Sequence, residues 1–207
     1  MNELPMVAST VTVPHEGAQF AFSAENRDRI AFIVSQYPEK QAALLPVLWI
    51  AQEQVLADSS RPRVLSADVI SAVASALDLA PAYVWGVTTF YTMYHAKPVG
   101  EHLIEVCTSV GCCLTGGEEL YQHLRSRLGI DSDLGGTTSD GKFTLRRAEC
   151  LAACGYAPML QLDEGPFIEN LSNAKADRLI ERLRNGEDVS DLAAPPRGVT
   201  PMMDGGQ

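Results

Sequence analysis

Apolar residues recur at helical spacing through the first half of the chain. Between residues 23 and 94 this pattern predicts four short helices. Ser23 and Ser66 are suitable N-caps for the first and third helices, and Pro81 suits the first turn of the fourth. The second helix contains Pro46, which must lie in its first turn or kink it. The first half of the chain is therefore predicted to form a small helical bundle.

The period changes after a break at residues 95–100. Stretches rich in branched residues, or alternating between apolar and polar ones, predict strands at 102–107, 143–146 and 159–162. A helix is predicted from Thr115, where Thr115 and Glu118 have capping-box spacing, and another from near Asn173. The order strand, helix, strands, helix predicts a compact α/β domain.

These patterns divide the chain into four predicted parts. They are a flexible N-terminal arm at 1–22, a helical bundle domain at 23–96, an α/β domain at 97–186 and a flexible C-terminal tail at 187–207. The two end parts contain no helical or strand period, and their Ser, Pro and Gly content is typical of linkers.

Composition narrows the class of protein. The chain has 207 residues, of which 46% are hydrophobic, and a formal net charge of −10. Such a chain can bury a core, and its acidity disfavours nucleic acid and anionic lipid as partners. Its most apolar run, residues 42–51, is too short for the roughly 20 residues that cross a bilayer. The N-terminus lacks the basic and apolar regions of a signal peptide, so we expect a cytoplasmic protein without membrane insertion.

The five cysteines all lie in the second half, in two close pairs and one extra. Four residues separate Cys107 from Cys112, and three separate Cys150 from Cys154. In a reducing compartment such a cluster indicates metal or redox chemistry rather than a disulfide framework. Cys113 directly follows a pair member, and because consecutive side chains diverge we interpret it as a bystander, or as a substitute ligand if Cys112 is lost.

The spacing leaves three interpretations open: a [2Fe-2S] cluster with two cysteines on each iron, a structural zinc site, and a disulfide redox pair. It favours the first, since zinc pairs usually form knuckles in small Cys-rich modules and a Cys-x-x-Cys motif is absent. The oxidised cluster with four thiolates is a dianion, which needs hydrogen-bond donors. We expect Gly111 and Gly155 to bring backbone N–H groups close to the sulfurs, and Arg146 and Arg147 to offset charge.

Longer motifs surround these residues. They are Tyr37-Pro38, Ala43-Leu44-Leu45-Pro46, Thr89-Phe90-Tyr91, Lys97-Pro98-Val99-Gly100, Cys107-Thr108 with Cys112, Glu149-Cys150-Leu151 with Cys154, and Ala157-Pro158. With these motifs the sequence, from about Ser23 to Gly186, resembles the thioredoxin-like [2Fe-2S] subunit of NADH dehydrogenase, the respiratory complex I.

The resemblance implies an α+β fold, in which a helical bundle precedes a thioredoxin-like α/β domain carrying one [2Fe-2S] cluster. It implies that Cys107, Cys112, Cys150 and Cys154 are the cluster ligands. The implied function is single-electron exchange with the FMN of a partner flavoprotein subunit that binds NADH, within a complex I peripheral to the inner face of the cell membrane. No nucleotide-binding motif is visible on this chain.

Two alternatives remain open. Equivalent diaphorase subunits occur in NAD-linked hydrogenases and formate dehydrogenases, and the cysteine motifs do not separate them from complex I. A zinc-binding interaction module would belong to a different class. The chain also departs from the family pattern at three positions: Gly111 where Pro is common, the additional thiol of Cys113, and Ala152 where many relatives have Gly. These departures predict an altered hydrogen-bonding environment with the ligands retained.

Overall fold

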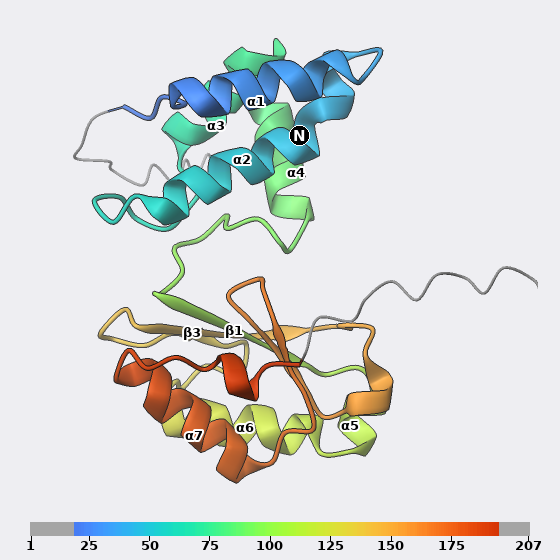
Figure 1. Cartoon of the computed structure of the whole chain (residues 1–207), viewed down its shortest axis with the longest axis vertical. Helices are drawn as coiled ribbons and strands as arrows, with labels where there is room; N and C mark the ends of the chain where they lie inside the picture. The colour runs from blue at the N-terminus through green and yellow to red at the C-terminus, as the bar shows by residue number, and fades with distance from the viewer. Residues whose placement is uncertain (1–18, 195–207) are drawn as a thin grey trace, which may run out of the picture. The chain divides into compact units, whose positions relative to one another are not determined.

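The computed structural model describes residues 19–194, and the chain divides between Pro98 and Val99 into two compact units (Figure 1). This division lies two residues after the boundary predicted at residue 96. Residues 1–18 of the predicted N-terminal arm and residues 195–207 of the predicted C-terminal tail lie outside the described residues.

The described part of the N-terminal unit contains four α-helices, close to the predicted positions. They are α1 (Ala24–Ser35), α2 (Leu44–Ala57), α3 (Ala67–Leu77) and α4 (Pro81–Phe90), with a short 3-10 helix η1 (Lys40–Ala43) before α2. The Ser23 hydroxyl caps α1 by accepting a hydrogen bond from the N–H of Asn26 at 3.1 Å. Pro46 lies in the first turn of α2, where its missing N–H breaks no helical hydrogen bond.

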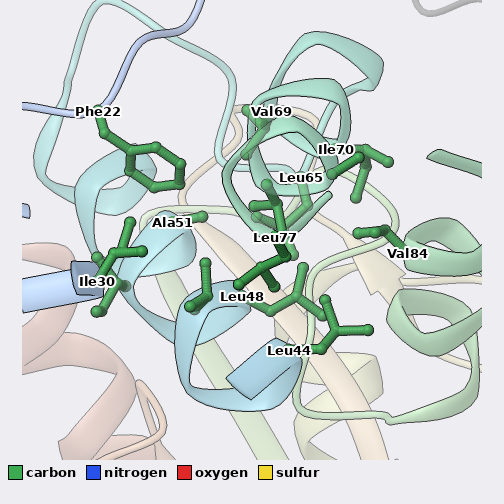
Figure 2. Close-up of a cluster of buried hydrophobic side chains, with 14 of the residues drawn as sticks. Phe22, Ile30, Leu44, Leu48, Ala51, Leu65, Val69, Ile70, Leu77 and Val84 are labelled. Carbon is green, nitrogen blue, oxygen red and sulfur yellow. The ribbon is translucent and has the colours of Figure 1, made fainter. Parts of the chain in front are cut away.

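One apolar core joins these helices. Figure 2 shows side chains from all four helices pointing toward one another, with Leu48 and Ala51 of α2 between Ile30 of α1 and the residues of α3. Two buried polar contacts connect the end of the unit to α2. The Gln52 amide donates to the carbonyl of Met93 at 2.9 Å and accepts from the N–H of His95 at 2.8 Å.

The predicted arm at 1–22 is wrong at its C-terminal end, because Phe20 and Phe22 pack into this core. Phe20 and Phe22 are buried and meet edge to face, with ring centroids 5.1 Å apart. The N–H of Phe20 donates to the Asp68 carboxylate at 2.9 Å, and the Gln54 amide donates to the carbonyl of Ala21. Sequence periodicity cannot detect this packing, because two isolated aromatic residues form no repeating pattern of apolar positions.

No single helix in residues 19–194 is both long and apolar enough to cross a membrane. The helices α3 and α4 pass the length and composition test only as a pair, and they are bent by 115° at the break between them.

The C-terminal unit is a five-stranded mixed sheet with helices. Its strands are β1 (His102–Cys107), β2 (Gly136–Thr137), β3 (Phe143–Ala148), β4 (Leu160–Leu162) and β5 (Phe167–Ile168), in the spatial order β2-β3-β1-β4-β5. Its helices are α5 (Val110–Leu114), α6 (Gly117–Leu128) and α7 (Asn173–Arg184), with 3-10 helices η2 (Cys154–Tyr156) and η3 (Ser190–Leu192). β1 and β3 are parallel, and the other pairs are antiparallel.

The sheet places the cysteine loops at one end. In the register of β1 and β3, Cys107 pairs with Ala148, so the loops after both strands leave the sheet at the same edge. Helices α6 and α7 lie side by side on one face of the sheet (Figure 1) and share its apolar core.

The helix predicted from Thr115 begins instead at Gly117, after Gly116 with φ 99°. The predicted capping box is wrong: the Thr115 hydroxyl donates to carbonyls of α5, and Glu118 pairs with Arg147. Because Thr115 closes α5, it is not available to cap α6.

The predicted flexible tail is wrong for residues 187–194, which pack on the unit. Leu192 in η3 is buried in the core, and the N–H of Ala194 donates to the carbonyl of Phe167 at 2.7 Å. Arg182 of α7 pairs with Asp191 at 2.8 Å. The polar residues of this segment obscure the apolar side chains that hold it to the core, namely Leu192 with the partly buried Val189 and Ala193.

Candidate iron–sulfur site

Two of the predicted ligands lie buried in direct contact. Cys107 is the last residue of β1, and Cys112 lies within α5; their exposed fractions are 2% and 1%. Burial, followed by a hydrogen bond to the Cys107 sulfur and the proximity of that thiol, raises the pKa of Cys112 to about 12. The Cys112 thiol is therefore protonated at neutral pH, and any metal bound here must displace its proton.

The other two predicted ligands are exposed. Cys150 lies in the loop that follows β3, and Cys154 begins η2. The loop of Cys154 packs directly on α5, since a Cβ built at Gly111 would lie 3.7 Å from the Cys154 sulfur. The proximity of Cys154 also contributes to the raised pKa of Cys112. The structure thus brings Cys107, Cys112 and Cys154 together from two separate stretches of the chain.

Cys150 is less closely associated with the others. Its sulfur accepts a hydrogen bond from the N–H of Ala152 at 3.4 Å. Within residues 19–194, no three His, Cys, Asp or Glu side chains are arranged around the position of one metal ion.

Backbone donors are present, but they come from residues that the sequence analysis missed. The N–H of Met159 bonds to the Cys112 sulfur, and the N–H of Cys107 donates to the carbonyl of Met159 at 3.1 Å. The expected roles of Gly111 and Gly155 are not supported, because a Cβ at either position meets no severe contact. The departure of Ala152 from the family pattern could have drawn attention to it as a backbone donor. No feature of the sequence singles out Met159.

The two arginines expected to offset the cluster charge have carboxylate partners of their own. Arg146 pairs with Glu105 at 3.5 Å, and Arg147 forms a two-pronged ion pair with Glu118. The Arg147 guanidinium also stacks on the ring of Tyr121, 3.8 Å from its centroid. Their main observed role is structural: Arg146 links β3 to β1 through Glu105, and Arg147 links β3 to α6 through Glu118.

Cys113 differs from its neighbour in environment. It is exposed, and its thiol donates to the carbonyl of Thr108 at 3.2 Å. Its side chain diverges from the buried one of Cys112, as expected for consecutive helical residues. Its predicted role as a bystander stays a prediction.

The site fits an iron–sulfur group in its donor chemistry. All of the converging side chains are thiols, the ligands preferred in iron–sulfur sites, and backbone N–H groups reach the sulfurs of Cys112 and Cys150. The side chains packed around Cys107 and Cys112 are apolar or small, and limit water around these two sulfurs: Leu151, Ala153, Ala157, Met159 and Phe167.

The family model for thioredoxin-like [2Fe-2S] ferredoxins matches residues 30–184, which includes most of both units. The chain belongs to this family. Membership confirms the predicted thioredoxin-like fold class and the [2Fe-2S] cluster as its cofactor. The same family model covers both the N-terminal helices and the C-terminal unit with its cysteines.

Relatives within the family cover most of the chain. It is 36% identical over 166 residues to one of the NADH-quinone oxidoreductase subunits of Rhizobium meliloti, and the match covers 80% of this chain and 93% of the relative. It is 33% identical over 199 residues to NADH dehydrogenase [ubiquinone] flavoprotein 2, mitochondrial, of Dictyostelium discoideum, covering 92% and 77%.

A solved structure confirms the fold. The NAD+-reducing [NiFe]-hydrogenase in the air-oxidized state matches with a TM-score of 0.63 and 20% identity, over 78% of this chain and 27% of the hydrogenase chain. At this identity the likeness concerns the fold alone.

Proposed function

We propose that this chain is an electron-transfer subunit of an NADH:quinone oxidoreductase, equivalent to the [2Fe-2S] subunit of respiratory complex I. The observation that carries this proposal is the meeting of α5 and η2, which brings the cysteine loops together in a chain that aligns with nearly the whole length of the Rhizobium meliloti relative. When bound, the [2Fe-2S] cluster exchanges one electron at a time with the FMN of a partner subunit that oxidises NADH.

The ligands in this proposal are Cys107, Cys112, Cys150 and Cys154. The contact of Cys107 with Cys112 and the closeness of Cys154 support three of them. Cys150 lies two residues beyond the end of β3, on an exposed loop at the same edge of the sheet. Its position there supports its inclusion as the fourth.

The protein's own contribution is the environment of the sulfurs. The N–H groups of Met159 and Ala152 stabilise negative charge on Cys112 and Cys150, and thereby favour binding of a dianionic group. The pairing of Arg147 with Glu118 holds β3 against α6, which keeps the strand ends in register.

The same proposal places the chain in a multi-subunit complex with an NADH- and FMN-binding flavoprotein and further complex I subunits. We infer that it sits at the inner face of the cell membrane through that complex, without inserting itself. The absence of a single membrane-spanning helix among residues 19–194 is consistent with this location.

The alternative is that the chain is a subunit of an NAD-linked hydrogenase or formate dehydrogenase. The fold match to a hydrogenase is compatible with this alternative. The relatives with 33–37% identity are subunits of NADH dehydrogenases, which favours the respiratory complex.

The test is purification of the full chain from its native cells under anaerobic conditions. We expect a red-brown protein that dithionite bleaches, an EPR signal on reduction, and co-purification with a flavoprotein and quinone-module subunits. Hydrogenase or formate-oxidising subunits in their place would support the alternative host. A colourless, EPR-silent protein containing zinc would contradict the electron-transfer function and support the interaction module.

A further inference from the structure

One ion pair joins the two stretches of chain that carry the cysteines. Arg147 lies near the end of β3, three residues before Cys150, and Glu118 lies in the first turn of α6. Both Nη atoms of Arg147 donate to the Glu118 carboxylate, and the bond from Nη2 to Oε1 is 2.8 Å long. A two-pronged pair of this kind fixes orientation as well as distance.

The glutamate follows a residue that touches the backbone of both buried cysteines. A Cβ built on Gly117 would lie 2.8 Å from the carbonyl oxygen of Cys112 and 3.0 Å from that of Cys107. Only glycine allows so close an approach. The first turn of α6, with Glu118, is therefore held directly against the proposed ligand segment.

The arginine is equally close to the ligands along its own strand. In the parallel register of β1 and β3, Arg147 lies opposite Val106, the residue before Cys107. Three residues of chain span at most about 11 Å, which limits the distance between the Cα atoms of Arg147 and Cys150. The ion pair thus lies at the root of both cysteine loops.

The arginine side chain is fixed from several sides. Its guanidinium stacks on the ring of Tyr121, which is fully buried, at 3.8 Å from the ring centroid. Its Nε donates to the carbonyl of Asp133 at 3.4 Å, and the Tyr121 hydroxyl donates to the same carbonyl at 3.1 Å. The positive charge therefore stays at one place relative to the strand end.

The charges in this group are balanced. The hydrogen bonds from Arg147, and then from Gln122, lower the pKa of Glu118 to about 2, and the bond to Glu118 raises the pKa of Arg147. Both are ionised at neutral pH. The neighbouring charges, Arg125 and Asp133, form an ion pair of their own. Two positive and two negative charges thus sum to zero.

The cysteine segments contribute no charged side chains themselves. Residues 107–117 and 150–162 include no Asp, Glu, Lys, Arg or His. The electrostatic field at the sulfurs therefore comes from charges outside these segments, and Arg147 and Glu118 are among the nearest along the chain. Reduction of a [2Fe-2S] cluster adds one negative charge, so its potential responds to every unit charge within about 10 Å.

Folding stability does not account for this ion pair. The side chains of Arg147 and Glu118 are 31% and 43% exposed, and ion pairs at such exposure contribute little to the free energy of folding. Their effect on a nearby redox centre is larger, because it acts on a group that changes its own charge.

We propose that Arg147 and Glu118 set the reduction potential of the cluster through their two opposed charges, without touching it. This inference rests on the four proposed ligands. The guanidinium favours the reduced cluster, the carboxylate favours the oxidised one, and the ion pair holds both charges at fixed positions beside the cysteine loops. The two opposing effects nearly cancel in the wild-type chain.

The test removes each charge alone and both together, in Glu118→Gln, Arg147→Gln and the double variant. Each full-length chain is produced in the native cells, purified anaerobically with its cluster, and titrated with redox mediators while EPR follows the reduced form. At the wild-type midpoint potential, we expect the ratio of reduced to oxidised cluster to rise at least about threefold in Glu118→Gln and to fall at least about threefold in Arg147→Gln. The double variant should stay within about twofold of wild type.

Asp140→Asn is the matched control for the loss of one negative charge. Asp140 is exposed and precedes β3, so the six residues of that strand, about 20 Å, separate it from the cysteine loops. This distance is about twice the screening length at ordinary salt, and we expect the wild-type ratio. Arg147→Lys and Glu118→Asp keep both charges and should also stay near the wild-type ratio.

A purely structural role would give a different pattern. All three variants without the ion pair would then shift in the same direction, and the double variant would not be restored; that pattern would overturn the proposal. Loss of iron and acid-labile sulfide from both single variants would show that the pair serves cluster assembly instead, and would overturn it too.

Failure of this inference is distinguishable from failure of the proposed function. Unchanged potentials in variants that co-purify with a flavoprotein would overturn the inference and leave the electron-transfer function intact. Opposite shifts in a chain that co-purifies with no flavoprotein would support the inference and contradict the proposed partner.

Discussion

The backbone N–H of Ala152 points at the sulfur of Cys150 from 3.4 Å, and Ala152 holds a left-handed conformation with φ 58° to do so. For a residue with a Cβ this conformation costs roughly 1 kcal/mol, whereas Gly adopts it freely. The chain thus retains an alanine in a conformation that suits glycine, and the strained turn brings a hydrogen-bond donor to a proposed cluster ligand.

Replacing Ala152 with Gly should relieve this strain and keep the N–H in place. We expect the free energy of unfolding of the C-terminal unit to rise by about 0.5–1 kcal/mol, or less if the extra freedom of the unfolded chain offsets the gain. Urea unfolding of the cluster-loaded chain measures this change. A loss of more than about 1 kcal/mol would show that the methyl group has a packing role that outweighs its strain.

Replacing Ala152 with Pro removes the N–H and excludes positive φ. Without the donor, negative charge on the cluster ligands is less well stabilised, so we expect a lower reduction potential in whatever fraction of the chains retains the cluster. Redox titration followed by EPR checks this, with Ala152→Gly as the control that should keep the wild-type potential. Equal potentials in all three proteins would mean that this hydrogen bond does not tune the site.

The cysteines provide a direct test of the ligand set. Cys107→Ser and Cys154→Ser should each greatly reduce iron and sulfide per chain, because a hydroxyl is a poorer iron ligand than a thiolate. Cys113→Ser should keep both near the wild-type amounts, since its thiol bonds to a backbone carbonyl. Loss of the cluster in Cys113→Ser, or its survival in Cys107→Ser, would require a different assignment.

Asp68 should make the stability of the N-terminal unit depend on pH. Burial alone would raise the pKa of Asp68, but hydrogen bonds from Ser66, Arg61 and the N–H of Phe20 outweigh it and lower the pKa to about 2. The contribution of the Asp68 carboxylate to folding stability is complete above the ordinary pKa of 3.8. It is lost as the pH falls through the folded-state pKa of about 2. We expect a loss of ~2 kcal/mol across this window.

Thermal unfolding of the full chain between pH 5 and pH 2, roughly the range over which such a group titrates, measures this loss. The matched variant Asp68→Asn should be less stable than wild type at pH 5 and should lose less stability on acidification. Parallel curves for the two proteins would assign the acid sensitivity to other carboxylates.

Gly135 should tolerate no side chain. A Cβ there would collide with the carbonyl oxygen of Leu145 on β3, and φ is 87°. Gly141 also has positive φ, 71°, but has open space around it. We therefore expect Gly141→Ala to cost about 1 kcal/mol from backbone strain, and Gly135→Ala to cost about 2–4 kcal/mol. Chemical unfolding of both variants compares them, and similar losses would show that β2 shifts to accept the methyl group.

The long helices and the strands of the sheet centre are predictable because their signals are local. Ser23 and Pro81 mark helix starts, and the strand at residues 102–107 has a clear branched pattern. The two-residue strands β2 and β5 escape prediction, because so short a strand has no period to detect. The five-residue α5 looks like a loop for the same reason.

The candidate site is predictable in its ligand types but not in their surroundings. Cysteine spacing and neighbouring motifs indicate four candidate ligands, and this set stays a prediction. The burial of Cys107 against the exposure of Cys154 depends on how β1 and α5 enter the core, which no local pattern encodes. The partner of Arg147 depends on the register between β3 and α6, so the sequence can suggest a positive charge there but not its neutralisation by Glu118.

The packing of Ala194 on Phe167 protects the outer edge of the sheet. The carbonyl of Pro166 faces β4, and the next carbonyl, that of Phe167, faces away from β4 and is occupied by the N–H of Ala194. A chain shortened at Gly186 would leave that edge open for strand pairing between molecules, and would uncover the apolar site of Leu192 beside it. Such a shortened protein should aggregate on concentration, so residues 187–194 keep the molecule soluble as well as completing its fold.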